Sequence, residues 1–190
     1  MDQNLWQQLA RADRQAFASV FRYFYGKLFN YGRKFTELDL LVEDALQETF
    51  VIVWDNHTRF SNITNPDSYL FYTFRNTLFR KLKKELKSRQ REALHFTEPE
   101  FSAEYMLIKA EMDATLSMEL EAAIRSLPTR QREAIYLRFY EGLEYEQIAA
   151  IMGISVKASY KTVSKGIVHL RDKFNLSVSL LFLLLSADRL

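Results

Sequence analysis

Residues 143–173 constrain the fold most strongly, because their pattern is that of two short helices joined by a tight turn. Gly153 separates the helices, and glycine is the residue that most easily leaves a helix with a positive φ. Ser155 follows where its hydroxyl can accept an otherwise unpaired backbone N–H and so cap the second helix. The first helix carries an apolar stripe at the spacing of one helical face, made of Ile148, Ile151 and Met152. The pattern predicts a helix-turn-helix, with small Ala149 where the helices cross.

The second helix of this motif has an apolar side and a cationic side. The apolar side consists of Val156, Val163, Ile167 and Leu170, and the opposite side of Lys157, Lys161, Ser164 and Lys165. A cationic second helix is typical of DNA-binding helix-turn-helix motifs, whose N-terminal residues enter the major groove. The alternative is an ordinary helical hairpin whose lysines are only solvated. The predicted DNA contacts are Ser155, Lys157, Ala158, Lys161, Thr162 and Lys165.

Composition favours an all-α protein made of two small helical domains joined by a linker. Among 190 residues, 48% are hydrophobic and only 5 are glycine and 3 proline, so helical periodicity can run over long stretches. The absence of cysteine excludes disulfides and thiolate metal sites. The sequence has no phosphate loop or nucleophile elbow, and no metal-ligand spacing joins His57, His95 and His169. We expect no metal, no cofactor and no enzymatic activity.

Charge divides the chain into basic, acidic and basic stretches. Eight basic side chains face one acid over residues 75–91, eight acids face one base over 92–121, and nine bases face five acids over 125–173. This alternation is typical of two nucleic-acid-facing domains around a linker. A basic face that pairs with the chain's own acidic linker gives the same pattern. We place the first domain at residues 1–90, the acidic linker at 91–103, the second domain at 104–174 and an apolar tail at 175–190.

Apolar periodicity and capping residues predict the remaining elements. The aromatic residues of the first 30 positions form core stripes, and Asp13 is placed to cap the second helix. Residues 57–67 read as a loop, because Pro66 and polar residues interrupt the periodicity. A helix is expected from Ser102 to Ser126, and Pro128 suits the first turn of the next helix, which Gly142 ends. The first residues lack the features of a secretory signal, so we expect a cytoplasmic protein.

An acidic side distinguishes the predicted helix over residues 39–56. That side is made of Glu43, Asp44, Gln47 and Glu48, while Leu46, Phe50, Val53 and Trp54 mark another side. An acidic helix face is usually only solvated. A second interpretation is a docking surface for a basic partner.

The helix predicted over residues 69–87, with Ser68 as its cap, has two faces of different character. The buried seam is expected to be Leu70, Phe74, Leu78 and Leu82. Another side carries Tyr72, Asn76, Phe79 and Lys83, flanked by Arg75 and Arg80. Exposed rings between cations bind single-stranded nucleic acid, because the rings stack on unpaired bases and the cations hold phosphates. The alternative is that Tyr72 and Phe79 pack against a neighbouring helix.

These linked motifs resemble the bacterial σ70 family, and most closely its extracytoplasmic-function (ECF) group. Residues 127–171 resemble the family's promoter-recognition domain. Residues 44–56 (DALQETFVIVWDN) look like its polymerase-docking helix, and residues 66–84 (PDSYLFYTFRNTLFRKLKK) look like its promoter-melting helix. The motifs follow the family's order and spacing over about residues 5–173.

The resemblance implies a non-catalytic transcription initiation factor that gives core RNA polymerase its promoter specificity. The first domain would dock on the clamp helices of the polymerase β′ subunit through Asp44, Gln47, Glu48 and Trp54. The helix with Tyr72, Arg75, Asn76, Phe79, Arg80 and Lys83, together with the loop before it, would hold the melted −10 element. The second domain would read the −35 element and contact the β-flap, and an anti-σ factor is an expected partner. The runner-up is a one-component helix-turn-helix repressor or activator whose N-terminal domain senses a ligand or dimerises.

Two positions depart from the family's pattern. Ser159 stands where the recognition helix usually buries an aliphatic residue, so we expect looser packing or a slight rotation that lets Tyr160 cover the gap. Glu144 stands where the family commonly has a capping Ser or Thr. The tail at 175–190 lies outside the resemblance, and its apolar run is shorter than the roughly twenty residues that span a bilayer. We expect the tail to pack on a domain or on a partner.

Overall fold

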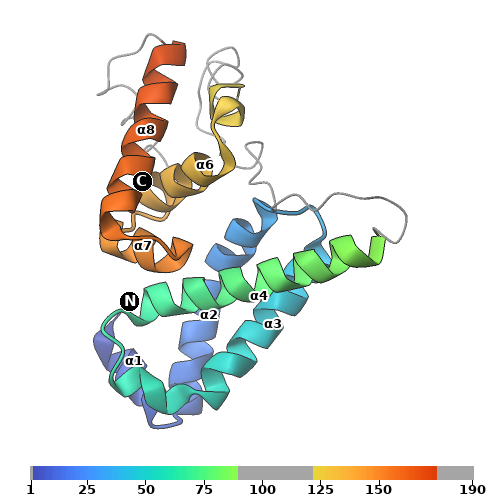
Figure 1. Cartoon of the computed structure of the whole chain (residues 1–190). Helices are drawn as coiled ribbons and strands as arrows, with labels where there is room; N and C mark the ends of the chain where they lie inside the picture. The colour runs from blue at the N-terminus through green and yellow to red at the C-terminus, as the bar shows by residue number, and fades with distance from the viewer. Residues whose placement is uncertain (1, 90–121, 175–190) are drawn as a thin grey trace, which may run out of the picture. The chain divides into compact units, whose positions relative to one another are not determined.

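The computed structural model describes residues 2–89 and 122–174, and all regular secondary structure in these ranges is helical, which confirms the predicted all-α class. The chain forms two compact units, Met1–Pro99 and Glu100–Leu190. The first comprises α1 (Gln3–Ala10), α2 (Arg14–Arg33), α3 (Asp39–Asp55), the 3-10 helix η1 (His57–Ser61) and α4 (Pro66–Arg89) (Figure 1). The second contains α6 (Thr129–Ile135), the π-helix η3 (Tyr136–Tyr140), α7 (Tyr145–Met152) and α8 (Val156–Phe174), after a helical stretch over 122–126. The predicted linker, most of the helix expected from 102 and the apolar tail lie outside the described residues.

Trp6 of α1 joins distant segments of the first unit. Its ring is 2% exposed and stacks on Phe60 of η1, with 5.0 Å between centroids and 9° between planes. Its indole N–H donates to Asp67 Oδ1 of α4 at 2.9 Å. The segment predicted as a loop therefore contains a 3-10 helix with a buried aromatic anchor. The loop prediction is wrong for residues 57–61, because packing of Phe60 on Trp6 stabilises a turn that local sequence does not favour.

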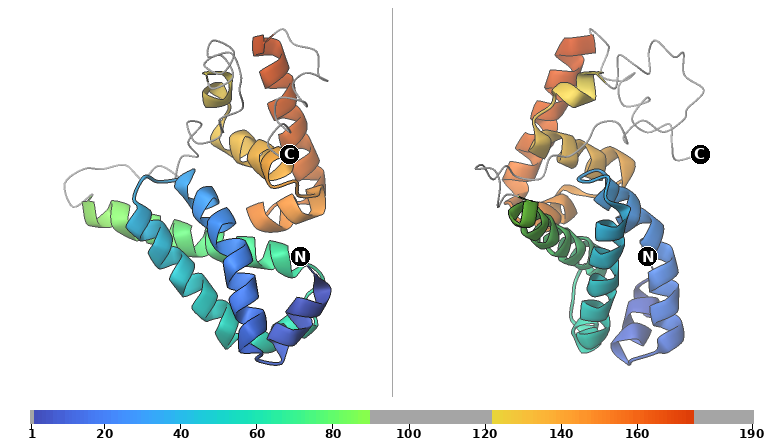
Figure 2. Two further views of the ribbon diagram at one scale, coloured as in Figure 1. Left: turned by 180° about the vertical axis from the view of Figure 1, so that it is seen from behind. Right: turned by 90° about the vertical axis from the view of Figure 1, so that its right-hand side faces the viewer.

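Gly32 allows α2, α3 and α4 to approach one another closely. A Cβ atom at Gly32 would lie 2.7 Å from Val42 Cγ1 of α3 and 2.9 Å from Phe74 Cζ of α4, distances that close-packed carbon atoms do not tolerate. Figures 1 and 2 show α4 running across α3. The predicted seam of α4 is confirmed, since its members are all buried: Leu70, Phe74, Leu78 and Leu82.

Capping residues set where the helices of the first unit begin. Asp13 caps α2 as predicted, with its Oδ1 accepting from the backbone N–H groups of the second and third helical residues at 2.7 and 3.1 Å. The prediction of Ser68 as the cap of α4 is wrong. The helix begins at Pro66, and Asn65 Oδ1 accepts from Ser68 N at 3.1 Å. Proline suits the first helical position because its fixed φ is already helical.

The helix-turn-helix of the second unit agrees with the pattern predicted for it. Gly153 ends α7 with φ +65°, and Gly142 ends the preceding helix with φ +67°. Ile148, Ile151 and Met152 are buried, as are Ala149, Val163 and Leu170. Val156 is 39% exposed, so its assignment to the buried side is wrong: it is the first residue of α8, where no preceding turn covers it. Where α8 meets α6, a Cβ at Gly166 would lie 2.9 Å from Ile135 Cγ1.

Two kinds of feature are absent from residues 2–89 and 122–174. None of the helices there is long and apolar enough to cross a membrane. No group of three or more His, Cys, Asp or Glu side chains there is placed to hold a metal ion.

Gly32→Ala is expected to lower the free energy of unfolding by about 1–3 kcal/mol, because the added methyl group overpacks the crossing of α2, α3 and α4. Gly26→Ala is the matched control, since Gly26 also lies in α2 but a Cβ there would meet no atom within 4 Å. Alanine should stabilise that position by about 0.5–1 kcal/mol. Urea unfolding followed by circular dichroism measures both, and equal changes in the two variants would contradict the crossing.

Candidate nucleic-acid interface

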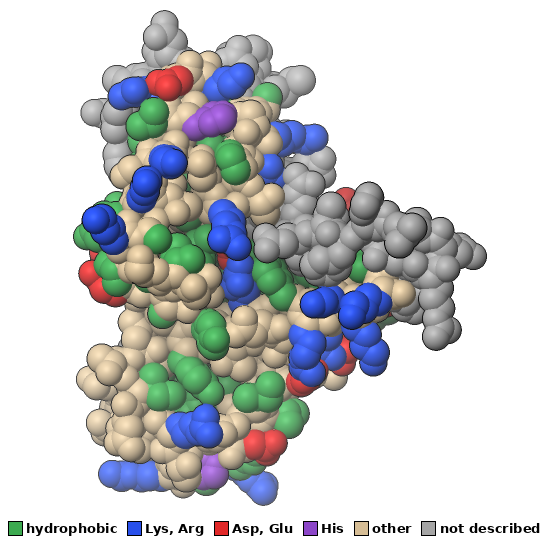
Figure 3. Space-filling model, in the orientation of Figure 1, with side chains coloured by type: hydrophobic (Ala, Val, Ile, Leu, Met, Phe, Trp, Pro, Cys, Tyr) green, Lys and Arg blue, Asp and Glu red, His purple; other side chains and the backbone are tan. Residues whose placement is uncertain are grey.

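The outer side of α8 carries the predicted helix-turn-helix contacts. Lys157, Lys161 and Lys165 are exposed, as is Ser155. The Ser155 hydroxyl accepts from Ala158 N at 3.2 Å, which confirms its capping role. Ala158 and Thr162 are half-buried, and Thr162 Oγ1 donates back to the Ala158 carbonyl at 2.7 Å. Figure 3 shows basic side chains recurring along α8. Three lysines and the capping serine of the helix are thus exposed to a partner. The two other predicted contacts, Ala158 and Thr162, are only partly exposed.

Ser159 is fully buried. Its hydroxyl lies 2.9 Å from the Tyr145 carbonyl oxygen and 2.8 Å from that of Val156, so the polar group has hydrogen-bond acceptors. A hydrogen bond to the start of α7 thus stands where the family pattern has an aliphatic contact. Tyr160 does not turn inward; it is 48% exposed and stacks on Tyr145. Glu144 caps α7 despite the departure from the family pattern, in a capping box with Gln147.

The predicted strand-binding residues of α4 differ in exposure. Tyr72 is 42% exposed, and Asn76, Arg80 and Lys83 are exposed as well. Phe79 is half-buried, with its ring packed edge-on against Phe35 at 4.9 Å between centroids. The alternative that these rings pack against a neighbouring helix therefore holds for Phe79 but not for Tyr72.

Arg75 lies beside this strip, with its guanidinium carbon 4.2 Å from the centroid of the Phe79 ring. The cation covers one face of the ring that Phe35 supports at its side. Further along the helix, Lys and Arg side chains gather over the C-terminal half of α4 (Figure 3). The surface of α4 thus combines one well-exposed ring with an amide and several cations.

Ion pairs join the acidic side of α3 to α4. Glu48 contacts both Arg80 and Lys81, with its Oε2 at 2.9 Å from Lys81 Nζ, and Asp44 also contacts Lys81. The hydrogen bond from Lys81, followed by that from Arg80, lowers the pKa of the Glu48 carboxyl below its ordinary value. Burial acts to lower the pKa of Lys81, but its hydrogen bonds to Asp44 and Glu48 outweigh burial and raise it. The acids predicted for docking are therefore partly neutralised by cations of the predicted DNA-binding helix.

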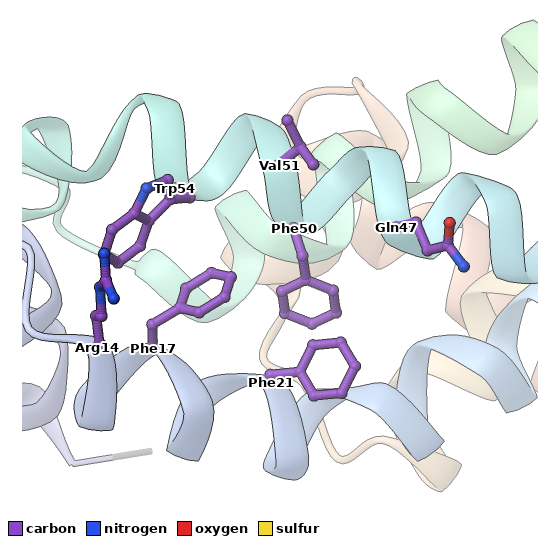
Figure 4. A pocket seen from close by; sticks show the side chains of 7 residues that line it. All are labelled: Arg14, Phe17, Phe21, Gln47, Phe50, Val51 and Trp54. Carbon is purple, nitrogen blue, oxygen red and sulfur yellow. The ribbon is translucent and has the colours of Figure 1, made fainter.

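An open apolar groove of about 600 Å³ lies between α2 and α3. Figure 4 shows aromatic rings from both helices converging in it, with Arg14 at the end near Trp54. The side chains that line it are Arg14, Phe17, Phe21, Gln47, Phe50, Val51 and Trp54. Gln47 and Trp54 were predicted as docking residues, and both line this groove, at its opposite ends in Figure 4.

Sequence reasoning missed three exposed or half-exposed apolar residues of this groove. Phe17 and Phe21 were assigned to the core, yet Phe21 is 37% exposed. Val51 was not singled out, and at 57% exposed it is an apolar side chain in water. One feature of the sequence could have revealed them: the aromatic stripe of α2 contains more rings than a single buried seam needs. Residues three and four apart share a helix face. On α3, Val51 therefore has Gln47 and Trp54 as neighbours on one side and Glu48 as its neighbour on the other.

Glu48→Gln and Lys81→Met are expected to show a coupling free energy of about 0.2–1 kcal/mol at neutral pH, the usual size for a pair that water still reaches. The folded pKa of Glu48 lies below its unfolded value, so the stabilisation is present above the unfolded pKa and is lost as pH falls through the folded one. A double-mutant cycle from urea unfolding at neutral and acidic pH measures this. Glu43→Gln is the control on the same helix and should be additive with Lys81→Met; equal coupling in both cycles would contradict the pair.

Two protein-family models match the chain. Sigma-70 region 2 matches residues 20–88, and Sigma-70 region 4 matches residues 117–170. The first match contains the α2–α3–α4 crossing, and the second contains the helix-turn-helix. Together they cover well over half of the sequence.

Curated relatives agree with these matches. The chain is 33% identical over 117 residues to the ECF RNA polymerase sigma factor EcfG of Rhodopseudomonas palustris, which is 60% of each chain. It is 38% identical over 60 residues to the ECF RNA polymerase sigma factor SigE of Mycolicibacterium smegmatis, 32% of this chain and 23% of that one. The chain thus spans less than two thirds of the length of these relatives.

Two solved structures share the fold at 22% sequence identity. One is the sigma factor RpoE in complex with the anti-sigma factor NepR from Bartonella quintana, with a TM-score of 0.62 over 85% of this chain and 98% of that one. The other is CnrH in complex with the cytosolic domain of CnrY, with a TM-score of 0.56 over 92% and 97%. Since region 2 and region 4 occur here in one chain, in order and on the matching helices, the chain belongs to the σ70 family, in its extracytoplasmic-function group.

Proposed function

We propose that the chain is a transcription initiation factor that binds core RNA polymerase and directs it to promoters by their −10 and −35 elements. The observation that carries the proposal is the pairing of two DNA-suited helix surfaces in one chain. One is the lysine side of α8 in a helix-turn-helix, and the other is the side of α4 that presents Tyr72 among cations. The chain acts without enzymatic chemistry of its own, in the cytoplasm where the polymerase works.

The −35 element is assigned to α8. Lys157, Lys161 and Lys165 place positive charge along one side of a helix that stands free of α7 on that side. Each lysine that neutralises a phosphate releases counterions, which makes duplex binding salt-dependent. The N-terminal turns of such a helix reach base edges. In this proposal Ser155, Ala158 and Thr162 lie against the DNA at the same end of the helix.

The −10 element is assigned to α4, with Tyr72 rather than Phe79 as the main stacking ring. Tyr72 is exposed and Asn76 lies one turn further on the same side, where its amide can bond an unpaired base edge. Phe79 is engaged with Phe35 and Arg75, so its contribution is to hold the cation in place. Arg75, Arg80 and Lys83 then supply charge for the phosphates of the melted strand.

Polymerase docking is assigned to the exposed side of α3 and the adjoining groove. Asp44, Gln47, Glu48 and Trp54 frame Val51, and the groove presents aromatic faces beside it. An apolar centre with a polar rim is the composition of a protein interface. The partner surfaces are the β′ clamp helices for this unit and the β-flap for the second unit. RpoE of Bartonella quintana is solved in complex with the anti-sigma factor NepR, and by analogy an anti-σ factor that covers these surfaces regulates the chain.

Core polymerase supplemented with the chain is expected to give run-off transcripts from a promoter that core polymerase alone does not use. Val51→Glu should prevent this by placing a charge in the apolar centre of the docking surface, with loss of association in a pull-down. Tyr23→Glu is the matched control, because Tyr23 is 46% exposed but lies outside the groove. Transcription that is independent of the chain, or duplex-operator binding by a two-fold dimer without polymerase, would favour the one-component regulator instead.

Replacing Tyr72 and Asn76 together by alanine is expected to spare polymerase association and duplex binding but to impair open-complex formation. The stacking ring contributes about 1–3 kcal/mol per base, and that contribution is made only to the melted strand. Permanganate footprinting on closed and pre-melted templates measures the defect, which a pre-melted −10 bubble should relieve only in part. Normal opening by the double variant would remove α4 from the proposed melting role, and circular dichroism checks that the helix is intact.

A further inference from the structure

Tyr160 is an exposed aromatic ring on the proposed DNA-reading side of α8. It is 48% exposed, and Lys157 three residues before it and Ser164 four residues after it, which share its side of the helix, are exposed as well. The exposed half of the ring is apolar area that a partner can cover, and burial of apolar area is what stabilises such rings in a complex. Its position suggests that a partner covers it.

Tyr160 is held in place by a stack of side chains. Its ring lies 3.7 Å from that of Tyr145, with 22° between the planes. The guanidinium carbon of Arg138 lies over the Tyr145 ring at 4.8 Å from its centroid. Since Tyr160 already covers one face of Tyr145 at contact distance, the guanidinium takes the other face. Tyr145 is therefore clamped between a ring and a cation.

The clamp is itself fixed to the backbone around the start of α7. Arg138 Nη1 donates to the Leu143 carbonyl at 2.8 Å and pairs with Glu144 Oε2 at 3.1 Å. Next to Tyr160, the buried Ser159 hydroxyl lies 2.9 Å from the Tyr145 carbonyl oxygen. The ring and the backbone of Tyr145 thus hold two successive residues of α8. A side chain that is ordered before binding loses less conformational entropy when DNA arrives.

We propose that Tyr160 reads a thymine methyl group in the major groove of the −35 duplex, with Tyr145 and Arg138 as its positioning residues. The inference rests on the proposed function, in which α8 enters that groove. One face of the Tyr160 ring is covered by Tyr145, so the opposite face and the ring edge are the surfaces left for DNA. A neutral ring releases no counterions and cannot read the donor and acceptor pattern of base edges as an amide does. The thymine methyl is the apolar feature that a base pair presents in the major groove.

The test removes that methyl group alone. A duplex is first selected by the full chain from a library with a randomised core, and each thymine is then replaced in turn by uracil. Fluorescence anisotropy gives the affinity of the unchanged chain, Tyr160→Ala and Tyr160→Phe. At one thymine, uracil is expected to weaken binding by the unchanged chain about fourfold, the effect of one methyl-sized group left in water. Tyr160→Ala should bind the thymine and uracil duplexes equally, and Tyr160→Phe should keep the difference.

The variants separate the contact from its support. Tyr145→Leu removes the stack and should reduce the uracil effect while leaving the salt dependence of binding unchanged. A uracil effect that persists in Tyr160→Ala at every thymine would overturn the inference. Loss of the effect in Tyr160→Phe as well would assign the contact to the hydroxyl group and overturn the methyl reading.

Lys161→Ala distinguishes failure of this inference from failure of the proposed function. The lysine should contact phosphate, so its removal is expected to weaken binding to all duplexes and to reduce the salt slope by about one, while the uracil effect remains. If Lys161→Ala behaves in this way and Tyr160→Ala keeps the uracil effect, only the role of Tyr160 fails. If the unchanged chain selects no duplex, or if Lys161→Ala alters neither the affinity nor the salt slope on the selected duplex, the −35 role of α8 fails with it.

Discussion

Close helix crossings at two glycines determine which side chains of each unit reach the surface. Gly32 admits Val42 and Phe74 at distances that a Cβ atom would forbid, and Gly166 does the same for Ile135. The first crossing presses one side of α4 against α2 and α3, so the side with Tyr72 and Asn76 faces outward. The second presses one side of α8 against α6, so the lysines face outward. The two proposed DNA surfaces are thus consequences of how the cores close, and ring contacts then position single side chains on them, as Phe79 does for Arg75 and Tyr145 for Tyr160.

Ion pairs in the first unit link the proposed docking surface on α3 to the proposed DNA surface on α4. Glu48 and Asp44 belong to the exposed side of α3, but their partners Arg80 and Lys81 belong to α4. Pairs that water reaches contribute about 0–1 kcal/mol each, so exchanging them for contacts with a polymerase or a phosphate costs little. The same cations can therefore stabilise the free protein and bind a strand in a complex. In the described part of the chain, no segment covers the apolar groove in the way that Arg80 and Lys81 neutralise the acids. Substitution of Val51 therefore tests docking more directly than substitution of the acids.

Periodicity and capping chemistry predicted most of the fold, because both act over a few neighbouring residues. Asp13, Gly153 and Ser155 perform the local roles assigned to them. The helix crossing at Gly32 could not be predicted from the sequence. A glycine within a helix lowers helix propensity, and its role in close packing becomes visible only when the atoms opposite it are known. The pairs between α3 and α4 join residues 32 and 37 positions apart, and the groove takes its lining from two helices. Ser159 shows the same limit: it looks like a packing defect in sequence, and its partner at Tyr145, 14 residues away, turns it into a hydrogen bond.

The exposure of one ring on α4 limits what the chain can do to DNA alone. Stacking contributes about 1–3 kcal/mol per base, whereas each base-pair step of duplex DNA is stabilised by about 1.4 kcal/mol on average. With Phe79 packed against Phe35, Tyr72 can hold about one unpaired base, which offsets the opening of one or two steps. Opening a longer stretch requires free energy from elsewhere, and cations that bind phosphate in both duplex and single strand do little to favour the melted form. In the proposed function the polymerase supplies that free energy, and the contribution of α4 is to choose which base is captured once the strands separate.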